Sequence, residues 1–338
     1  MKVLVHFAPG PKHDIYEGAR LRKNIKGALE LNNIAWVDSL YALPDVCHII
    51  SPTDEALAKA AKEEGIPLVV SALYSEHDPY ASFMTRSLSG ELSLTSKGKK
   101  IIELADMVLT PSEYTKSLIV NEILGKHIEV LTPGVNPIRF DTIDPLSEKI
   151  FARYERFSAD TKYFLVAGNY ADKKTLENLR LLAIALPSYR FFNIGGDYGQ
   201  RAKALSKLNK HNPKNLTFLP VVPDDIYRSA MKGALGHVVF ESSTMESLVC
   251  LEAMAAKTQI FYIGGKDLHE TFLAASKSFI QYASIEEAAK RIPTFTPSSP
   301  EATIMEGYKV AQENNLTMLG NALKTLYRSL IQKEGNHD

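Results

Sequence analysis

Short runs of β-branched and aromatic residues alternate with amphipathic helical patterns along almost the whole chain, and this alternation restricts the possible folds most. In the first part of the chain, strand-like runs and helical patterns alternate at 3–7, 20–33, 47–51, 54–65 and 67–72. Consecutive parallel strands need a crossover helix, so this spacing predicts a parallel, doubly wound α/β sheet.

The pattern weakens once and then starts again, which predicts two domains. Residues 141–162 are polar and contain one proline, and a second strand–helix series begins at Tyr163. A chain of 338 residues is also about twice the usual domain size. We expect two Rossmann-like domains, 1–150 and 151–310, joined near 142–160. A long amphipathic stretch at 302–331 predicts one closing helix. We expect its C-terminal part, at 311–338, to pack back across the N-terminal domain.

Composition excludes several classes of partner. Lys+Arg and Asp+Glu both number 39, so no net charge draws the protein to nucleic acid or to anionic lipid. Two cysteines cannot form a disulfide framework and are typical of a reducing compartment. The N-terminal apolar run is too short for a signal peptide, and no stretch approaches a spanning helix of about 20 apolar residues. We therefore expect a cytoplasmic protein whose basic helix faces could touch the inner membrane surface peripherally.

Five loops that follow strand-like runs are candidate ligand sites, because parallel sheets bind ligands beyond the carboxyl ends of their strands. Glycine, hydroxyl or basic residues, which suit a phosphorylated ligand, occur in these loops. The five loops lie at 9–22, 73–83, 168–175, 195–201 and 241–247. Loops that face one another across a cleft between two domains predict a nucleotide or nucleotide-sugar site.

Four longer segments resemble the family-4 glycosyltransferases of the GT-B fold, in the same order along the chain. They are ADMVLTPSEYTKSLI (105–119), HIEVLTPGVNPIRFD (127–141), AGNYADKKTLENLRLLAIALPSYRFFNIGG (167–196) and VVPDDIYRSAMKGALGHVVFESSTMESLVCLEAMA (221–255). Within that family, RSLSGELSLTSKGKKIIELAD (86–106), EYTKSLI, LPSYRF and the closing helix are most similar to bacterial hexosyltransferases that act on diacylglycerol glycosides.

The resemblance implies a fold, a reaction and partners. It implies two Rossmann-like domains with a cleft between them, and transfer of a hexose from a nucleoside-diphosphate sugar with retention of configuration. The expected donor is a UDP-sugar, and no metal or cofactor is expected. A lipid, glycan or protein acceptor would be held by the N-terminal domain, with a partner glycosyltransferase as a further option.

The family's paired glutamates map onto the segment 241–256. The second glutamate, which binds the nucleotide ribose, corresponds to Glu252, with Ser247 also expected at the nucleotide. The first, which contacts the donor sugar, would fall eight residues earlier, on Thr244. Glu246 is the candidate substitute for it as a catalytic carboxylate.

The remaining candidates concern the donor phosphates and the sugar. The family's basic pair falls on Asn169, after Gly168, and on Lys174, so only the lysine matches. Arg20 or Lys173 could compensate. The family's glycine-rich first loop is reduced here to a segment with Gly18 and Arg20, and His77 is displaced from the position of the family's N-domain histidine.

Several candidates also have a structural interpretation, and Glu246 could be a solvated acid at a helix N-terminus. Glu252 could serve only the helix dipole, Lys174 could be a surface residue, and His77 could be part of a loop cap. Gly18 with Arg20 could be no more than a helix start.

Two other functions stay open. One is a catalytically inactive GT-B protein that binds an acceptor or a partner transferase, which the changes at Thr244 and Asn169 favour. The other is a GT-B-like epimerase, which the segments PSEYTKSLI and TPGVN disfavour.

Overall fold

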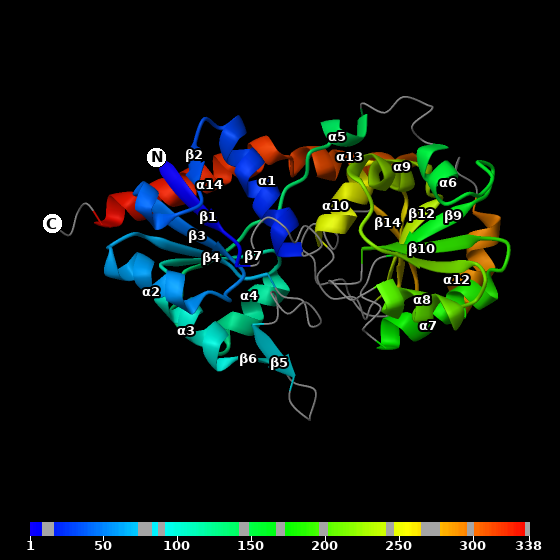
Figure 1. The fold of residues 1–338 in the computed structure, drawn as a ribbon, viewed down its shortest axis with the longest axis horizontal. Coiled ribbons are helices and arrows are strands. Elements are labelled where there is room, and N and C mark those ends of the chain that lie inside the picture. The colour runs from blue at the N-terminus through cyan, green and yellow to red at the C-terminus, as the bar shows by residue number, and fades with distance from the viewer. Residues whose placement is uncertain are drawn as a thin grey trace. The chain divides into compact units, whose positions relative to one another are not determined.

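The computed structural model describes residues 1–8, 17–73, 83–86, 92–141, 149–166, 173–195, 202–240, 247–264, 278–295 and 301–334. These residues form two compact units (Figure 1). Unit 1 holds the described residues up to Gly134 together with those from Asn314 onward. Unit 2 holds the described residues between Val135 and Glu313.

Unit 1 is built on a six-stranded parallel sheet in the order β2-β1-β3-β4-β7-β8. Its elements are β1 (Lys2–His6), α1 (Glu17–Leu31), β2 (Ala35–Val37), the 3-10 helix Leu40–Ala42, β3 (Val46–Ile50), α2 (Glu55–Glu63), β4 (Leu68–Ser71), β5 (Met84–Arg86), β6 (Leu92–Leu94), α3 (Ser96–Leu104), β7 (Met107–Thr110), α4 (Glu113–Val120), β8 (Ile128–Val130) and α14 (Leu316–Glu334). The antiparallel pair β5–β6 was not anticipated from the sequence.

The central strands of unit 1 are buried on both faces, which explains their continuous apolar runs. Every residue of β3, β4 and β7 is buried. Helices α1 and α14 cover one face of the sheet, and α2, α3 and α4 cover the other (Figure 1). Side-chain caps define the helix starts: Asp54, Thr95 and Ser112 each accept a hydrogen bond from the backbone three residues on.

The prediction of one closing helix is wrong in detail, because two helices occupy that stretch. α13 (Glu301–Glu313) belongs to unit 2, and the long α14 belongs to unit 1. Asn315 Oδ1 accepts a hydrogen bond from the Met318 backbone N–H at 3.0 Å, so Asn315 is the N-cap at which a new helix begins. The sequence periodicity continues through this break and therefore hid it.

Helix α14 lies against α1 in unit 1 at very close range (Figure 1). A Cβ on Gly320 would come 2.0 Å from Asn32 Nδ2 and 2.3 Å from the Ala28 carbonyl oxygen. Asn32 in turn donates to the Thr317 carbonyl at 3.2 Å. Only glycine therefore permits this approach of the two helices.

Gly320→Ala is expected to destabilise unit 1 by about 1–3 kcal/mol, because the added methyl must push the two helices apart. Trp36 is the only tryptophan and lies in β2, so its fluorescence during urea unfolding reports on this unit. Asn321→Ala, at an exposed neighbouring position of α14, should leave the midpoint unchanged. Equal midpoints for the two variants would contradict close packing at Gly320.

Unit 2 contains a second six-stranded parallel sheet, in the order β11-β10-β9-β12-β13-β14. Its elements are α5 (Ile138–Asp141), α6 (Ile150–Tyr154), β9 (Tyr163–Val166), α7 (Lys173–Ala185), β10 (Arg190–Ile194), α8 (Ala202–Lys210), β11 (Leu216–Leu219), α9 (Asp224–Gly233), β12 (Gly236–Phe240), α10 (Ser247–Ala255), β13 (Ile260–Ile263), β14 (Phe279–Tyr282), α12 (Ile285–Arg291), the 3-10 helix Ile292–Thr294 and α13. The predicted pair of Rossmann-like parallel sheets is confirmed.

Two apolar clusters cover the two faces of the sheet in unit 2. One cluster includes side chains of α6, α9, α10 and α13, and the other includes side chains of α7 and α12. Figure 1 shows these two sets of helices on opposite sides of the sheet.

The division after Gly134 lies ahead of the boundary expected near residue 150. Phe140, just before the expected linker at 142–160, and Phe151, within it, are both 0% exposed and belong to the core of unit 2. Phe151 also packs edge-on against Phe157 and Phe192. The polar residues of this stretch suggested a linker, but its widely spaced phenylalanines are part of the core.

Candidate functional site

The strand order of unit 2 places a candidate ligand-binding edge between β9 and β12. Helix crossovers leave in opposite directions from these two neighbouring strands, and such a switch point opens a crevice at the carboxyl ends of the strands. The segments after β9 and β12 lead into α7 and α10. The first backbone N–H groups of a helix have no partner within the helix itself and favour anions. The candidate donor segments of the sequence follow these two strands.

Part of the predicted donor site lies outside the described residues. Gly168, Asn169, Thr244 and Glu246 fall in the undescribed segments 167–172 and 241–246. Ser247 is placed by its backbone as the first residue of α10. Lys174 is the second residue of α7 and has an exposed side chain, so it lies at the helix end that favours anions.

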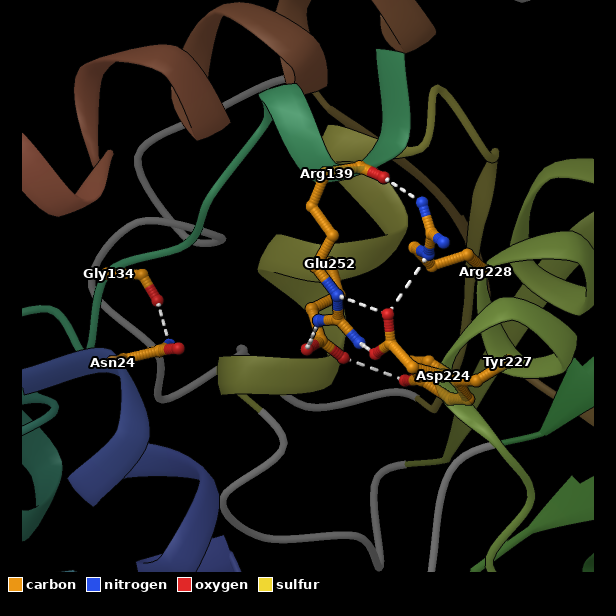
Figure 2. A network of polar contacts seen from close by, with 7 residues as sticks. All are labelled: Asn24, Gly134, Arg139, Asp224, Tyr227, Arg228 and Glu252. Atoms are coloured by element: carbon orange, nitrogen blue, oxygen red, sulfur yellow. Dashed lines mark hydrogen bonds and ion pairs between the residues drawn. The ribbon is translucent and has the colours of Figure 1, made fainter. Parts of the chain in front are cut away.

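Glu252 is a buried carboxylate in the second turn of α10. Its side chain is only 6% exposed, and both oxygens have partners: Arg139 Nη1 lies 3.2 Å from Oε1, and Tyr227 Oη donates to Oε2 at 2.7 Å. Figure 2 shows Arg139 and Tyr227 reaching this carboxylate from α5 and α9. A helix dipole acts mainly within the first turn, so these partners, rather than the dipole, hold the charge.

Arg139 connects Glu252 to a second carboxylate, Asp224. Its guanidinium forms a salt bridge with Asp224, and the Arg139 carbonyl accepts a hydrogen bond from Arg228 Nη1 at 3.0 Å (Figure 2). Arg228 Nε also forms an ion pair with Asp224 Oδ2 at 3.1 Å. The two arginines balance the two carboxylates, so this network carries no net charge.

The pKa of Arg139 reflects the same contacts. Burial disfavours its charge, but the hydrogen bond to Asp224 and the charges of Glu252 and Asp224 outweigh burial and raise the pKa. The guanidinium is therefore a permanent cation beside Glu252. Breaking a partly buried pair of this kind by removing one partner typically costs a few kcal/mol, about 3–5 where burial is complete.

The sequence pointed to Glu252 but not to the residues that hold it. Arg139 stands 113 positions away from Glu252, and Tyr227 stands 25 positions away. The only local signal was the Asp224–Arg228 spacing, which puts opposite charges on one helix face.

In unit 1, the structure gives Gly18 a packing role. Gly18 is the second residue of α1, and a Cβ there would come 2.3 Å from the Phe7 ring. It therefore lets α1 approach the end of β1. Arg20 follows in the first turn of α1 with a half-buried side chain, whereas His77 lies outside the described residues.

A further polar pair in unit 1 was not predicted. His6, at the end of β1, is paired through Nε2 with Asp54 Oδ2 at 2.9 Å, and Asp54 also caps α2. Burial lowers the pKa of His6, and the Asp54 charge opposes that shift. The pair lies at the switch point of this sheet, between β1 and β3.

Two further observations concern metal and membrane. Among the described residues, no three His, Cys, Asp or Glu side chains come together as metal ligands would. Within the same residues, no helix combines the length and the apolar character needed to cross a bilayer.

No protein-family profile matches the chain. The processive diacylglycerol alpha-glucosyltransferase of Acholeplasma laidlawii is 23% identical over 240 residues, which cover 69% of this chain and 70% of that protein.

Solved structures resemble the chain over nearly its whole length. Sucrose-phosphate synthase from Thermosynechococcus elongatus superposes with a TM-score of 0.72 at 14% identity, covering 98% of this chain and 99% of that one. Anabaena HepE, in complex with UDP and glucose, superposes with a TM-score of 0.68 at 13% identity, covering 97% and 99%. The chain therefore has the GT-B fold of glycosyltransferases, as its resemblance to family 4 predicted.

Proposed function

We propose that the protein is a retaining glycosyltransferase that moves a hexose from a nucleoside-diphosphate sugar, which binds at the carboxyl edge of the unit 2 sheet. The observation that carries this proposal is the Glu252 carboxylate, held by Arg139 and Tyr227 on the helix that follows β12. Because Glu252 is buried and both of its carboxylate oxygens have hydrogen-bond partners, its side chain has a fixed orientation. Such an arrangement suits recognition of a polar ligand.

Glu252 is the residue that we expect to bind the ribose. Arg139 and Tyr227 fix the direction of its carboxylate. A ribose presents two neighbouring hydroxyl donors, and hydrogen bonds to a charged acceptor are stronger than neutral ones. Glu252 would therefore bind the 2′ and 3′ hydroxyls, with Ser247 close by at the start of the same helix.

The diphosphate would lie across the starts of α7 and α10. The N-terminal dipoles of the two helices and the charge of Lys174 would stabilise the charge that develops on the departing phosphate. A single donor of this type contributes about 3–4 kcal/mol to transition-state stabilisation in other enzymes. With Asn169 at the family's arginine position, Lys174 carries more of this task, and Gly168 would let the chain approach the phosphates. Glu246 would contact the sugar.

The comparisons support a UDP-sugar as donor and a lipid as acceptor. HepE binds UDP and glucose, and the A. laidlawii relative acts on diacylglycerol. We therefore propose that unit 1 holds a glycolipid or related acceptor, near Gly18, Arg20 and His77. A lipid acceptor would bring the enzyme to a membrane surface.

A second candidate is an inactive GT-B protein that binds an acceptor or a partner glycosyltransferase. Thr244 and Asn169, where family 4 has a glutamate and an arginine, favour it. Such a protein would retain the fold and the Glu252 network but would not transfer sugar.

Nucleotide binding followed by transfer separates the two candidates. We expect UDP at 100 times its dissociation constant to stabilise the protein by about 2.7 kcal/mol, which corresponds to a rise in Tm of about 5–10 °C for a unit of this size. Radiolabelled sugar transfer to lipid extract or to peptide then identifies the acceptor. A Tm unchanged by UDP, GDP, ADP and CDP would reject the enzyme proposal, and binding without transfer to any acceptor would favour the inactive protein.

A further inference from the structure

Three buried polar side chains form a chain of hydrogen bonds through unit 1. Tyr327 Oη of α14 lies 2.6 Å from His48 Nδ1 of β3, and His48 Nε2 lies 2.8 Å from Ser71 Oγ at the end of β4. Tyr327 and His48 are 0% exposed, and Ser71 is 6% exposed. Burial lowers the pKa of His48 to about 3, so its imidazole is neutral and carries one ring proton.

The position of that proton follows from Tyr327. A phenol buried this deeply must donate its hydrogen, and His48 Nδ1 is the acceptor within reach. Nδ1 therefore carries no proton, and the imidazole hydrogen is on Nε2, which donates to Ser71 Oγ. The opposite direction would leave the Tyr327 hydrogen without an acceptor in the core. The hydroxyl hydrogen of Ser71 is consequently directed away from His48.

Ser71 borders a cavity of about 20 Å³ at the carboxyl ends of β4, β7 and β8. Thr110, at the end of β7, lines the same cavity; it is 1% exposed, and its Oγ1 has no hydrogen-bond partner in the described part of the chain. The rest of the wall has no charged side chain and is mainly apolar, with Leu21, Ile25, Leu319 and Leu323 among its residues and Thr132 as a third residue that carries a hydroxyl. The buried side chains of Ser71 and Thr110 thus border a cavity with mainly apolar surroundings.

We propose that this cavity binds a hydroxyl group of a neutral alcohol. A hydroxyl oxygen accepts the hydrogen that Ser71 is forced to donate, and its own hydrogen reaches Thr110 Oγ1. A carboxylate or phosphate would be buried here without a cation, and a hydrocarbon would leave Thr110 Oγ1 and the hydroxyl hydrogen of Ser71 without a partner in the cavity. The volume admits about one oxygen, with the carbon chain directed outward along the leucines. Water meets the same polar requirements, so the alcohol displaces a water molecule.

The link to catalysis rests on the proposed function. The alcohol would be an anchoring hydroxyl of the acceptor, because an oxygen enclosed between Ser71 and Thr110 is not available for attack on a sugar. The acceptor then carries at least two hydroxyls, one held in unit 1 and one that receives the sugar. His48 and Tyr327 are positioning residues in this scheme, since they act through Ser71.

Methyl NMR of the full chain, labelled at Ile and Leu, tests the site with 1-butanol as the probe. We expect saturable shifts of the Ile25 and Leu323 methyls with 1-butanol, and none with butyrate or 1-chlorobutane. Thr110→Val removes the hydroxyl at constant shape and should weaken butanol binding about threefold to tenfold. Thr53→Val is the matched control, because Thr53 Oγ1 is also buried without a partner in the described residues but lies outside the cavity.

Several outcomes would overturn this assignment. They are an absence of saturable shifts, equal shifts with 1-chlorobutane, or equal affinities of the Thr110→Val variant and the wild type. If Thr110→Val does not fold, Ser71→Ala takes its place with the same expectation. Long-range ¹H–¹⁵N spectra must also show His48 protonated on Nε2, and protonation on Nδ1 would reverse the donor direction and reject the site.

Titration of the same sample with UDP keeps the two proposals apart. Butanol binding without any effect of UDP would leave the cavity assigned and reject the glycosyltransferase. Methyl shifts caused by UDP without butanol binding would reject the cavity assignment and leave the glycosyltransferase proposal standing.

Discussion

Glu252→Gln is expected to remove most of the nucleotide affinity while the chain stays folded. Glutamine keeps the shape of the side chain but loses the charge that two ribose hydroxyls would bind. Each charge-assisted hydrogen bond contributes about 1.5–3 kcal/mol, so UDP affinity should fall by about a hundredfold or more. Isothermal titration with UDP measures the loss, and the rise in Tm should disappear with it, as it should for Glu252→Ala.

The ribose assignment has a more specific test in the choice of nucleotide. For the wild type, 2′,3′-dideoxy-UDP should bind far more weakly than UDP, and in Glu252→Gln the two should bind equally. Glu287→Gln is the matched control, because Glu287 is also paired with an arginine, Arg291 at 3.0 Å, on helix α12 of the same unit. A wild type that does not distinguish the two nucleotides would show that Glu252 does not bind the ribose.

The stability of unit 1 should fall steeply in mild acid because of His48. Its pKa is lowered from 6.5 to about 3 by burial, so the unfolded chain takes up a proton below pH 6.5 that the folded chain refuses. The contribution of neutral His48 to the free energy of unfolding is present above pH 6.5 and is lost progressively as the pH falls towards about 3. Between pH 7 and pH 5 the expected loss is about 2 kcal/mol, at 1.36 kcal/mol per pH unit.

Urea unfolding followed by Trp36 fluorescence between pH 5 and pH 7 measures this loss. His48→Gln should remove about 2 kcal/mol of the pH dependence, although it lowers stability at pH 7 because a buried hydrogen-bond network is disrupted. His127→Gln replaces a half-exposed histidine in the same unit and should retain the wild-type slope. Burial also lowers the pKa of His6, which adds a contribution of the same sign to all three proteins. Identical slopes for His48→Gln and the wild type would contradict a buried neutral His48.

The secondary structure was largely predictable because the patterns behind it are local. A strand buried on both faces needs a continuous apolar run, and β3, β4, β7 and β12 have one. The break between α13 and α14 was missed for a related reason. One asparagine cap interrupted the backbone without interrupting the apolar period.

The candidate site was predictable only in part. Resemblance to a family located Glu252, because a motif of neighbouring residues can be recognised in one sequence. The roles predicted for Glu252, Ser247, Lys174, Gly18 and Arg20 stay predictions. Those for Gly168, Asn169, Thr244, Glu246 and His77 also stay predictions, and these residues lie outside the described part of the chain.

By itself, the sequence determined two parallel α/β sheets, a long final helix and the position of one acid in the helix after β12. Only the tertiary structure decided what that acid touches, and that Tyr327 meets His48 across 279 residues of sequence. The physical reason is that secondary structure depends on residues close in sequence, whereas side-chain partners can be far apart in sequence. Backbone conformation and burial follow from neighbouring residues through period and capping, whereas the partner of a buried charge or hydroxyl depends on which distant helix packs above it.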